Sequence, residues 1–221
     1  MRVIVTGTTG MVGEGVMLEC LAHPTITEVL SVSRKSTGLS HPKLKEYLVD
    51  DFYQIQQNDE HLKGYDACFF CIGITSVGMQ EEDYTRFTYD MTMNFARATA
   101  PNKEMSFVYV SGIYADSTEK GKTMWARVRG RLENDLTKLP FKQAFAFRPA
   151  FMKAVKGQKH ARKMYSYIGW LYPILKVFAP KWVCTLSEVG QAMINATLYG
   201  YKTNIIEVND IKALAHFKTI N

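Results

Sequence analysis

The sequence predicts an α/β fold in which helices cover both faces of one doubly wound parallel sheet. Short β-branched or aromatic runs alternate with longer stretches of helical spacing, and a glycine-rich turn follows the first run. Strand, helix and strand in this order require right-handed crossovers, which build a parallel sheet. The run at residues 67–72 is apolar throughout and fits the middle of such a sheet, because helices bury both of its sides.

The alternation places each element in order along the chain. Strands are expected at residues 2–6, 28–33, 44–49, 66–72, 105–111 and 143–147, and the clearest helices at residues 11–21, 82–100 and 122–139. After Pro149 come a basic segment, an apolar run at 168–179, a helix at 187–199 and a last strand near 205–208. We expect one domain over residues 1–221, with residues 151–200 as a small substrate-side extension, because ligands bind outside the carboxyl ends of the strands.

Length and composition describe an ordinary globular chain. With 221 residues it can bury roughly 70% of its unfolded surface, which excludes a disulfide-stapled miniprotein. Hydrophobic residues make up 47% and charged residues 22%, which excludes a disordered or fibrous chain. The four cysteines lie in apolar runs and no cationic leader precedes the first strand, so we expect a cytoplasmic protein. Cys68 and Cys71 have CxxC spacing but no second ligand pair, so we expect no metal site.

The net charge of +6 is unevenly distributed. No Asp or Glu lies between Leu136 and Ser187, a stretch rich in Lys and Arg, so one face is expected to be cationic. A solvated surface, an anionic substrate and weak contact with a membrane surface remain open. No nucleic-acid-binding signature is present, so no nucleic-acid partner is expected. The apolar run at 168–179 is too short to span a bilayer, so we expect no transmembrane segment.

A glycine-rich turn directly follows the first strand and opens the first helix. It consists of Gly7, Thr8, Thr9, Gly10, Met11, Val12 and Gly13. Gly7 permits a tight turn, Gly10 lets a pyrophosphate approach the backbone, and Gly13 allows the helix to pack closely on the sheet. Amide groups at the start of a helix, together with its dipole, hold phosphate groups. These residues therefore predict a dinucleotide-binding Rossmann fold.

The end of the second strand predicts which dinucleotide is bound. NAD-selective sites carry an acidic residue there, whereas this chain has Arg34 and Lys35. Two cations suit a 2′-phosphate, so we predict NADP(H) over NAD(H). A charge-assisted contact of about 1.5 to 3 kcal/mol corresponds to a preference of about ten- to hundredfold.

The ends of the third and fourth strands add candidate cofactor contacts. Asp51 and Phe52 are expected to border the adenine. Cys71 and Gly73 are expected where the cofactor backbone passes, because a small residue is needed there.

These motifs together resemble one branch of a known superfamily. The residues that carry the likeness are Thr6-Gly7-x-x-Gly10-x-x-Gly13, Arg34, Cys71-x-Gly73 and Val110-Ser111-Gly112. They resemble atypical short-chain dehydrogenases/reductases, close to proteins labelled NAD-dependent epimerase/dehydratase and to relatives of the Tat-interacting protein. The resemblance extends to residues 148–151 and implies that Pro149 and Phe151 border the nicotinamide.

The resemblance also implies a catalytic set, from which this chain departs. The family uses a Ser after the fifth strand, a Tyr that transfers a proton, and a Lys four residues later. Ser111 matches the Ser, but Trp125 stands in place of the Tyr and Arg129 in place of the Lys. An indole cannot transfer that proton, whereas Arg129 can still bind ribose hydroxyls or phosphate. Tyr114 or Tyr109 is the alternative source of a phenol.

Three functions remain open at this point. The first is an NADPH-dependent oxidoreductase that passes hydride to a flat or conjugated carbonyl acceptor without a catalytic Tyr, since the cofactor carries the chemistry. Its acceptor would lie against an aromatic wall of Tyr114, Trp125, Phe151 and Trp170. The alternatives are a sugar-nucleotide epimerase or dehydratase, and a non-catalytic NADP-sensing regulatory or interaction protein.

Overall fold

The computed structural model, which describes residues 1–100, 102–155, 157–160 and 172–217, contains one seven-stranded parallel sheet. Its strand order is β3-β2-β1-β4-β5-β6-β9. The order reverses between β1 and β4, which is the switch point where doubly wound sheets bind ligands. The predicted α/β fold with a doubly wound parallel sheet is therefore confirmed.

The strands agree closely with the sequence pattern. They are β1 (Arg2–Thr6), β2 (Glu28–Ser33), β3 (Leu44–Leu48), β4 (Ala67–Phe70), β5 (Ser106–Val110), β6 (Gln143–Arg148) and β9 (Ile205–Glu207). In the centre, Val5 of β1 pairs with Ser31 of β2 on one side and with Phe69 of β4 on the other. Every residue of β4 is buried, as its continuous apolar sequence predicts.

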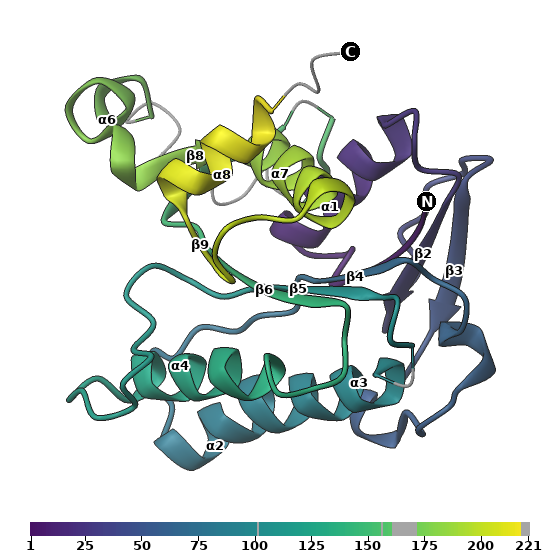
Figure 1. The fold of residues 1–221 in the computed structure, drawn as a ribbon, viewed down its shortest axis with the longest axis horizontal. Coiled ribbons are helices and arrows are strands. Elements are labelled where there is room, and N and C mark those ends of the chain that lie inside the picture. Colours follow the sequence, from purple (N-terminus) through teal and green to yellow (C-terminus); the bar gives the residue numbers. More distant parts are fainter. Residues whose placement is uncertain (101, 156, 161–171, 218–221) are drawn as a thin grey trace.

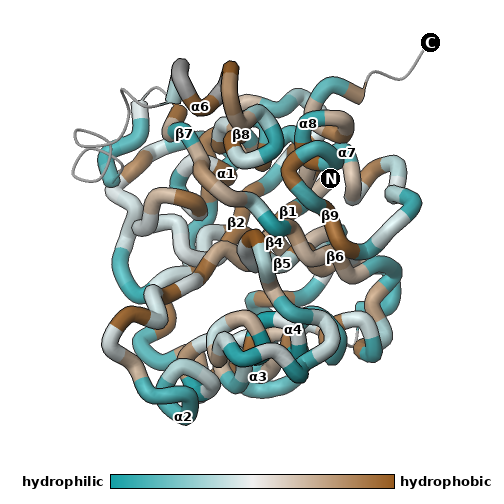
Figure 2. The backbone as a smooth tube through the Cα atoms, turned by 90° about the vertical axis from the view of Figure 1, so that its left-hand side faces the viewer, coloured by the Kyte–Doolittle hydropathy of each residue, from teal (hydrophilic) through white to brown (hydrophobic). Residues whose placement is uncertain are grey.

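Helices form a layer on each face of the sheet (Figure 1). One layer contains α1 (Met11–Ala22), α7 (Leu186–Tyr199) and α8 (Val208–Ala215). The other contains α2 (Glu81–Thr85), a π-helical turn (Arg86–Asp90), α3 (Met91–Thr99) and α4 (Met124–Leu136). Figure 2 shows the sheet between these two layers from the side on which α6 (Tyr172–Phe178) lies.

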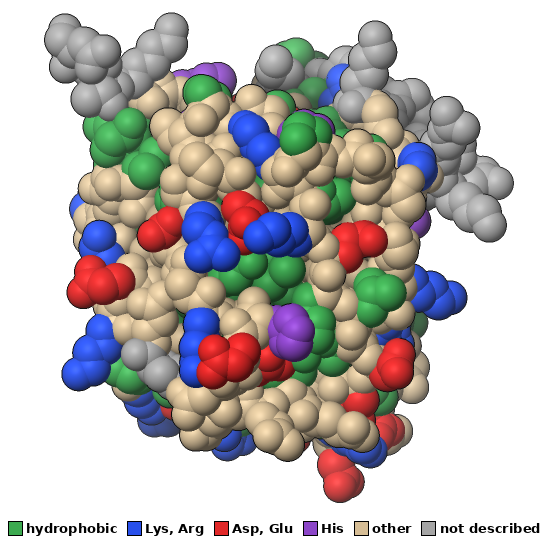
Figure 3. All heavy atoms as spheres, turned by 90° about the vertical axis from the view of Figure 1, so that its right-hand side faces the viewer, with side chains coloured by type: hydrophobic (Ala, Val, Ile, Leu, Met, Phe, Trp, Pro, Cys, Tyr) green, Lys and Arg blue, Asp and Glu red, His purple; other side chains and the backbone are tan. Residues whose placement is uncertain are grey.

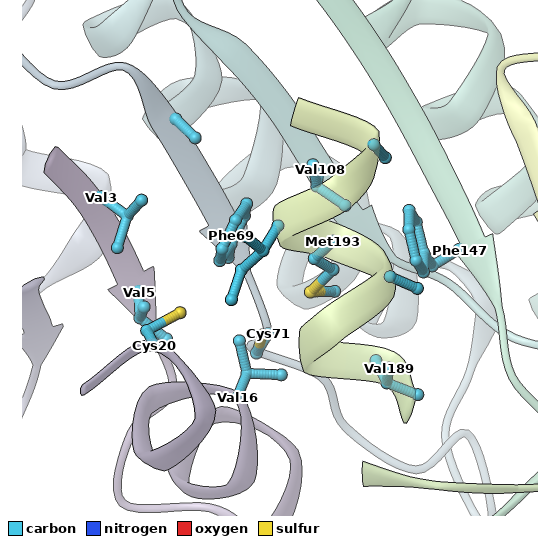
Figure 4. Packing of buried hydrophobic residues seen from close by; sticks show 14 of the residues in the cluster. Val3, Val5, Val16, Cys20, Phe69, Cys71, Val108, Phe147, Val189 and Met193 are labelled. Atoms are coloured by element: carbon cyan, nitrogen blue, oxygen red, sulfur yellow. The ribbon is translucent and has the colours of Figure 1, made fainter. Parts of the chain in front are cut away.

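The layer of α1 and α7 packs on the sheet through small and apolar side chains. Val5 and Phe69 from the strands meet Val16 of α1 and Met193 of α7 (Figure 4). The two helices lie so close that a Cβ added to Gly190 would come within 2.7 Å of the Cβ of Glu19. Within the predicted extension at 151–200, α7 therefore belongs to the central core.

Elsewhere in that extension, the described residues form a second, two-stranded sheet that the sequence pattern did not reveal. Strands β7 (Phe151–Lys153) and β8 (Val183–Thr185) pair in parallel, with Phe151 opposite Val183. Helix α8 was also missed, because its eight residues directly follow β9. None of the helices in the described part of the chain has the length and apolar character needed to cross a bilayer.

Candidate functional site

A cavity of about 460 Å³ opens at the carboxyl ends of the central strands, within the range of about 300 to 1,000 Å³ usual for ligand pockets. The glycine turn after β1 contributes Gly7, Thr9 and Gly10 to its lining. Arg34 follows β2, and Cys71 follows β4. The structure thus brings together residues that the sequence analysis assigned to one cofactor.

The glycine turn has the geometry of a phosphate-binding turn. Gly7 adopts a φ of 67°, and its carbonyl oxygen accepts a hydrogen bond of 2.9 Å from the Gly10 amide. A Cβ on Gly13 would lie 2.3 Å from the Gly7 oxygen, so only glycine lets α1 start this close to the turn. Gly10 caps α1 without a side-chain hydrogen bond, which leaves first-turn amide groups for a ligand. These features fit a bound pyrophosphate.

Several predicted cofactor residues do not line this cavity. The Thr8 side chain is buried and shares a 2.7 Å hydrogen bond with Ser31 of β2. Met11 and Val12 belong to the first turn of α1, and neither is part of the lining. Lys35 is exposed beside Arg34 but is not part of the lining.

The far wall of the cavity contains the cationic Arg34 and the loop at Asp51 and Phe52. Arg34 is exposed and forms no salt bridge with any residue in the described ranges. Asp51 accepts a 2.9 Å hydrogen bond from the Tyr53 amide, which starts a short helical turn. The Asn94 side chain donates to the carbonyl of the buried Phe52 at 2.9 Å, so this wall is anchored to α3.

The residues that follow β4 leave open space in the cavity beside the switch point. The Cys71 amide donates to the Thr6 hydroxyl at 3.0 Å, which ties β4 to β1. Burial raises the pKa of the Cys71 thiol, so this thiol stays protonated at the cavity edge. Gly73 also lines the cavity, and a Cβ added there would meet no atom within 4 Å. That open space matches the expected path of the cofactor backbone.

Sequence reasoning missed the apolar wall that faces these residues. Phe87 and Met91 line the cavity from the π-helical turn and the start of α3. Phe87 is 43% exposed, which is unusual for a large aromatic side chain inside a helical pattern. A π-helical turn is frequent at functional sites, but no sequence signal announces one.

Ser111 is held by a buried ion pair. Its hydroxyl donates to Glu133 of α4, whose two carboxylate oxygens both accept from the Arg148 Nε at 3.1 Å. Glu133 is only 4% exposed and Arg148 8%. Glu133 is not evident from the sequence, because its contact with Ser111 joins residues 22 positions apart. The predicted role of Ser111 in orienting a substrate stays a prediction.

Trp125 and Arg129 share the face of α4 that carries Glu133, at intervals of four residues. The Arg129 Nε donates to the Tyr84 hydroxyl at 2.9 Å, and its guanidinium carbon lies 5.9 Å from the Trp125 ring centroid. Burial acts to lower the pKa of Arg129, but nearby Tyr109, Tyr84 and Glu133 outweigh it and raise this pKa. Arg129 is therefore a permanent cation beside the end of β5.

The two alternative phenols differ sharply. Tyr109 is 2% exposed, and burial raises its pKa, so it cannot serve as a proton donor to a substrate. Tyr114 is 58% exposed and adopts a φ of 67° in the loop after β5. Its ring meets Trp182 edge to face, with ring centroids 5.5 Å apart. Trp182 is a further residue that sequence reasoning missed.

Pro149 and Phe151 lie beyond the cavity lining, just after the carboxyl end of β6. The Pro149 carbonyl accepts a 3.1 Å hydrogen bond from Ile113, which joins the loops after β5 and β6. The Phe151 ring centroid lies 6.4 Å from that of Tyr172. Trp170, the remaining member of the expected aromatic wall, lies outside the described residues.

Across the described ranges, no group of three or more His, Cys, Asp or Glu side chains is arranged to hold a metal ion.

Comparison with known proteins supports the fold. No family model matches the sequence. The chain is 23% identical over 207 residues to the mitochondrial protein fmp52-1 of Aspergillus terreus, which covers 89% of this chain and 87% of that protein. The similarity thus extends over nearly the whole of both chains.

Solved structures of nucleotide-dependent enzymes share the architecture. L-sorbose reductase of Gluconobacter frateurii, complexed with NADPH and L-sorbose, has a TM-score of 0.64 and 14% identity, covering 92% of each chain. UDP-glucuronic acid 4-epimerase of Bacillus cereus, complexed with NAD, has a TM-score of 0.63 and 11% identity, covering 96% of this chain and 81% of that one. The resemblance to dehydrogenases and epimerases is thus supported at the level of the fold. The narrower likeness to Tat-interacting-protein relatives stays a prediction.

One expectation is wrong. The chain was expected to be cytoplasmic, but its curated relatives from several fungi are named as mitochondrial proteins. The expectation rested on the residues that open the given sequence and on cysteine content, and neither of these features defines a compartment.

Proposed function

We propose that this protein is an NADP(H)-dependent oxidoreductase that passes hydride to a flat or conjugated carbonyl acceptor. The observation that carries the proposal is the cavity at the sheet switch point, which the glycine turn and Arg34 both line; Arg34 has no salt-bridge partner among the described residues. The turn provides backbone amides for the pyrophosphate, and Arg34 provides a cation for a 2′-phosphate. Among neighbours of this fold, one structure holds NADPH and another holds NAD, so the choice of dinucleotide rests on Arg34.

The residues at the end of β5 favour an acceptor that needs no tyrosine acid. The bound nicotinamide would supply the hydride. The resemblance places Trp125 at the position of the proton donor, and Tyr109 is buried, so we expect neither to supply a proton to a substrate oxygen. Arg129 contributes a positive charge that stabilises developing negative charge on a reduced acceptor. A flavin, a quinone or another conjugated carbonyl then takes its proton from water.

Steady-state kinetics of Arg34→Ala test the proposal. We expect the wild-type protein to oxidise NADPH in the presence of such an acceptor, with a kcat/KM for NADPH about ten- to hundredfold above that for NADH. Arg34→Ala should lower the value for NADPH and leave that for NADH nearly unchanged. The neighbouring Lys35→Ala is the matched control and should have the smaller effect, because Lys35 lies outside the cavity lining. Equal use of both nucleotides by the wild-type protein would refute the assignment of Arg34.

A further inference from the structure

Two aromatic side chains from distant parts of the chain meet on the substrate side of the sheet. Tyr114 and Trp182 are 58% and 49% exposed, and their rings pack edge to face at an interplanar angle of 67°. Large aromatic side chains are usually more buried than this. About half of each aromatic residue thus remains open to solvent although the two rings are in contact.

The fold fixes this pair beside the expected position of the nicotinamide. Tyr114 lies three residues after Ser111, in the loop that the Ile113 amide ties to Pro149. Trp182 directly precedes Val183, which pairs with Phe151 after β6. The rings therefore stand at the carboxyl ends of β5 and β6, where doubly wound folds bind their substrates.

Two backbone features hold the pair in place. Tyr114 has a φ of 67°, which is uncommon for a residue with a bulky side chain and is found most often at functional sites. The short helical turn Pro180–Trp182 is fastened to α8, because Lys212 donates from its Nζ to the Pro180 carbonyl at 2.5 Å. The two rings are thus presented by anchored segments.

We propose that Tyr114 and Trp182 form the acceptor-binding platform and make the enzyme selective for planar aromatic quinones. This inference rests on the proposed function, because the platform needs a hydride source beside it. A flat quinone stacks on exposed aromatic faces, whereas a puckered aliphatic ketone gains little from them. The pair thereby selects the acceptor by its shape. Residue 125 is Trp and offers no phenol as a proton donor.

The reaction balances with the groups named. A quinone takes up hydride, that is, two electrons and one proton, at a carbonyl oxygen; the C–H bond of the reduced nicotinamide breaks and an O–H bond forms. The second oxygen then carries the negative charge and takes a proton from water. The products are the hydroquinone and the oxidised nucleotide. Arg129 adds a fixed positive charge at the end of β5, because its guanidinium lies against Gly112. This charge would stabilise the negative charge on the second oxygen.

Calorimetric titrations with menadione, a planar quinone, and with cyclohexanedione, a puckered diketone, test the platform directly by binding. Both ligands are titrated into the full chain with saturating NADP⁺ and without nucleotide, so that no turnover is needed. We expect menadione to bind at least about tenfold more tightly than cyclohexanedione. Trp182→Leu and Tyr114→Leu should each weaken menadione binding about tenfold and leave cyclohexanedione binding unchanged.

Conservative and remote variants complete the design. Trp182→Phe and Tyr114→Phe keep a ring and should stay within about threefold of the wild-type dissociation constant. Tyr199→Leu removes a comparably exposed aromatic ring, 52% exposed, at the end of α7 and should change nothing.

The outcomes separate the two proposals. Loss of menadione binding in the two leucine variants, with NADP⁺ affinity intact, supports the platform. Wild-type menadione affinity in those variants, equal binding of the two ligands, or no menadione binding at all overturns it. A wild-type protein that binds menadione as expected but binds no nucleotide would instead overturn the proposed function.

Discussion

Two of the glycines that the sequence assigns to the cofactor site serve different purposes. Gly13 is required by the fold, because a Cβ there would lie 2.3 Å from the Gly7 carbonyl oxygen. At Gly73 an added Cβ would meet no atom within 4 Å, so the fold itself does not require glycine there. The empty space beside Gly73 is therefore available to a ligand.

A bulky residue at position 73 should block the cofactor without harming the fold. We expect Gly73→Val to unfold in urea within about 0.5 kcal/mol of the wild-type protein and to lose NADPH binding at least about tenfold. Gly13→Ala is the contrasting variant and should destabilise the fold by about 1 to 3 kcal/mol through overpacking. Tight NADPH binding by Gly73→Val would show that the cofactor does not pass this residue.

Among the elements, the neighbouring strands β1, β2 and β3 are joined by ion pairs. Acidic and basic side chains are interspersed on the face that carries β2 and β3 (Figure 3). Glu28 of β2 accepts from Arg2 at 2.8 Å and from Lys45 at 2.6 Å, and the Tyr65 hydroxyl donates to it at 2.9 Å. Burial acts to raise the pKa of Glu28, but these three partners outweigh it and lower this pKa to about 2.

This lowered pKa makes stability depend on pH. Because the pKa of Glu28 is lower in the folded than in the unfolded chain, its contribution is complete above about pH 4.5 and is lost as the pH falls toward 2. We expect Glu28→Gln to lower the free energy of unfolding by about 2 kcal/mol at pH 7 and by clearly less near pH 3. Urea unfolding at both pH values measures the difference. An equal loss at the two values would contradict this account.

Helix α4 is joined to β6 by a second, buried ion pair. Glu133 and Arg148 have side chains only 2% and 10% exposed. We expect Glu133→Ala to destabilise the fold by about 3 to 5 kcal/mol, because Arg148 keeps a buried charge without its main partner. A double variant, Glu133→Leu with Arg148→Met, should recover part of that loss. Urea unfolding of the wild-type protein and the two variants measures these differences. A loss of less than about 1 kcal/mol in the free energy of unfolding of Glu133→Ala would argue against a buried, coupled pair.

The same elements show how much the sequence could predict. The strands and the glycine turn follow from local patterns, since apolar runs, β-branched residues and a turn are neighbours along the chain. The contact of Ser111 with Glu133 and that of Tyr114 with Trp182 join residues far apart, and no local pattern encodes them. The short pair β7 and β8 was missed for the same reason, because three-residue strands carry too little pattern.

At the scale of the whole molecule, the sheet switch point connects these features. The cavity-lining turn, Arg34 and Gly73 lie on one side of the strand ends, while Tyr114, Phe151 and Trp182 lie on the side of β5 and β6. A dinucleotide that follows the strand ends would extend from the first group toward the second. The proposed oxidoreductase function therefore depends first on whether the protein binds NADP(H) at all.

An equilibrium titration with NADPH and NADH, followed by energy transfer from tryptophan to the nicotinamide, tests this most directly. Trp125 on α4, at the substrate end of the site, is the expected donor. We expect saturable binding of one NADPH per chain, at least about tenfold tighter than that of NADH and weakened at least about tenfold in Gly73→Val. If neither nucleotide binds, the glycine turn has only a structural role and the proposed oxidoreductase function is wrong.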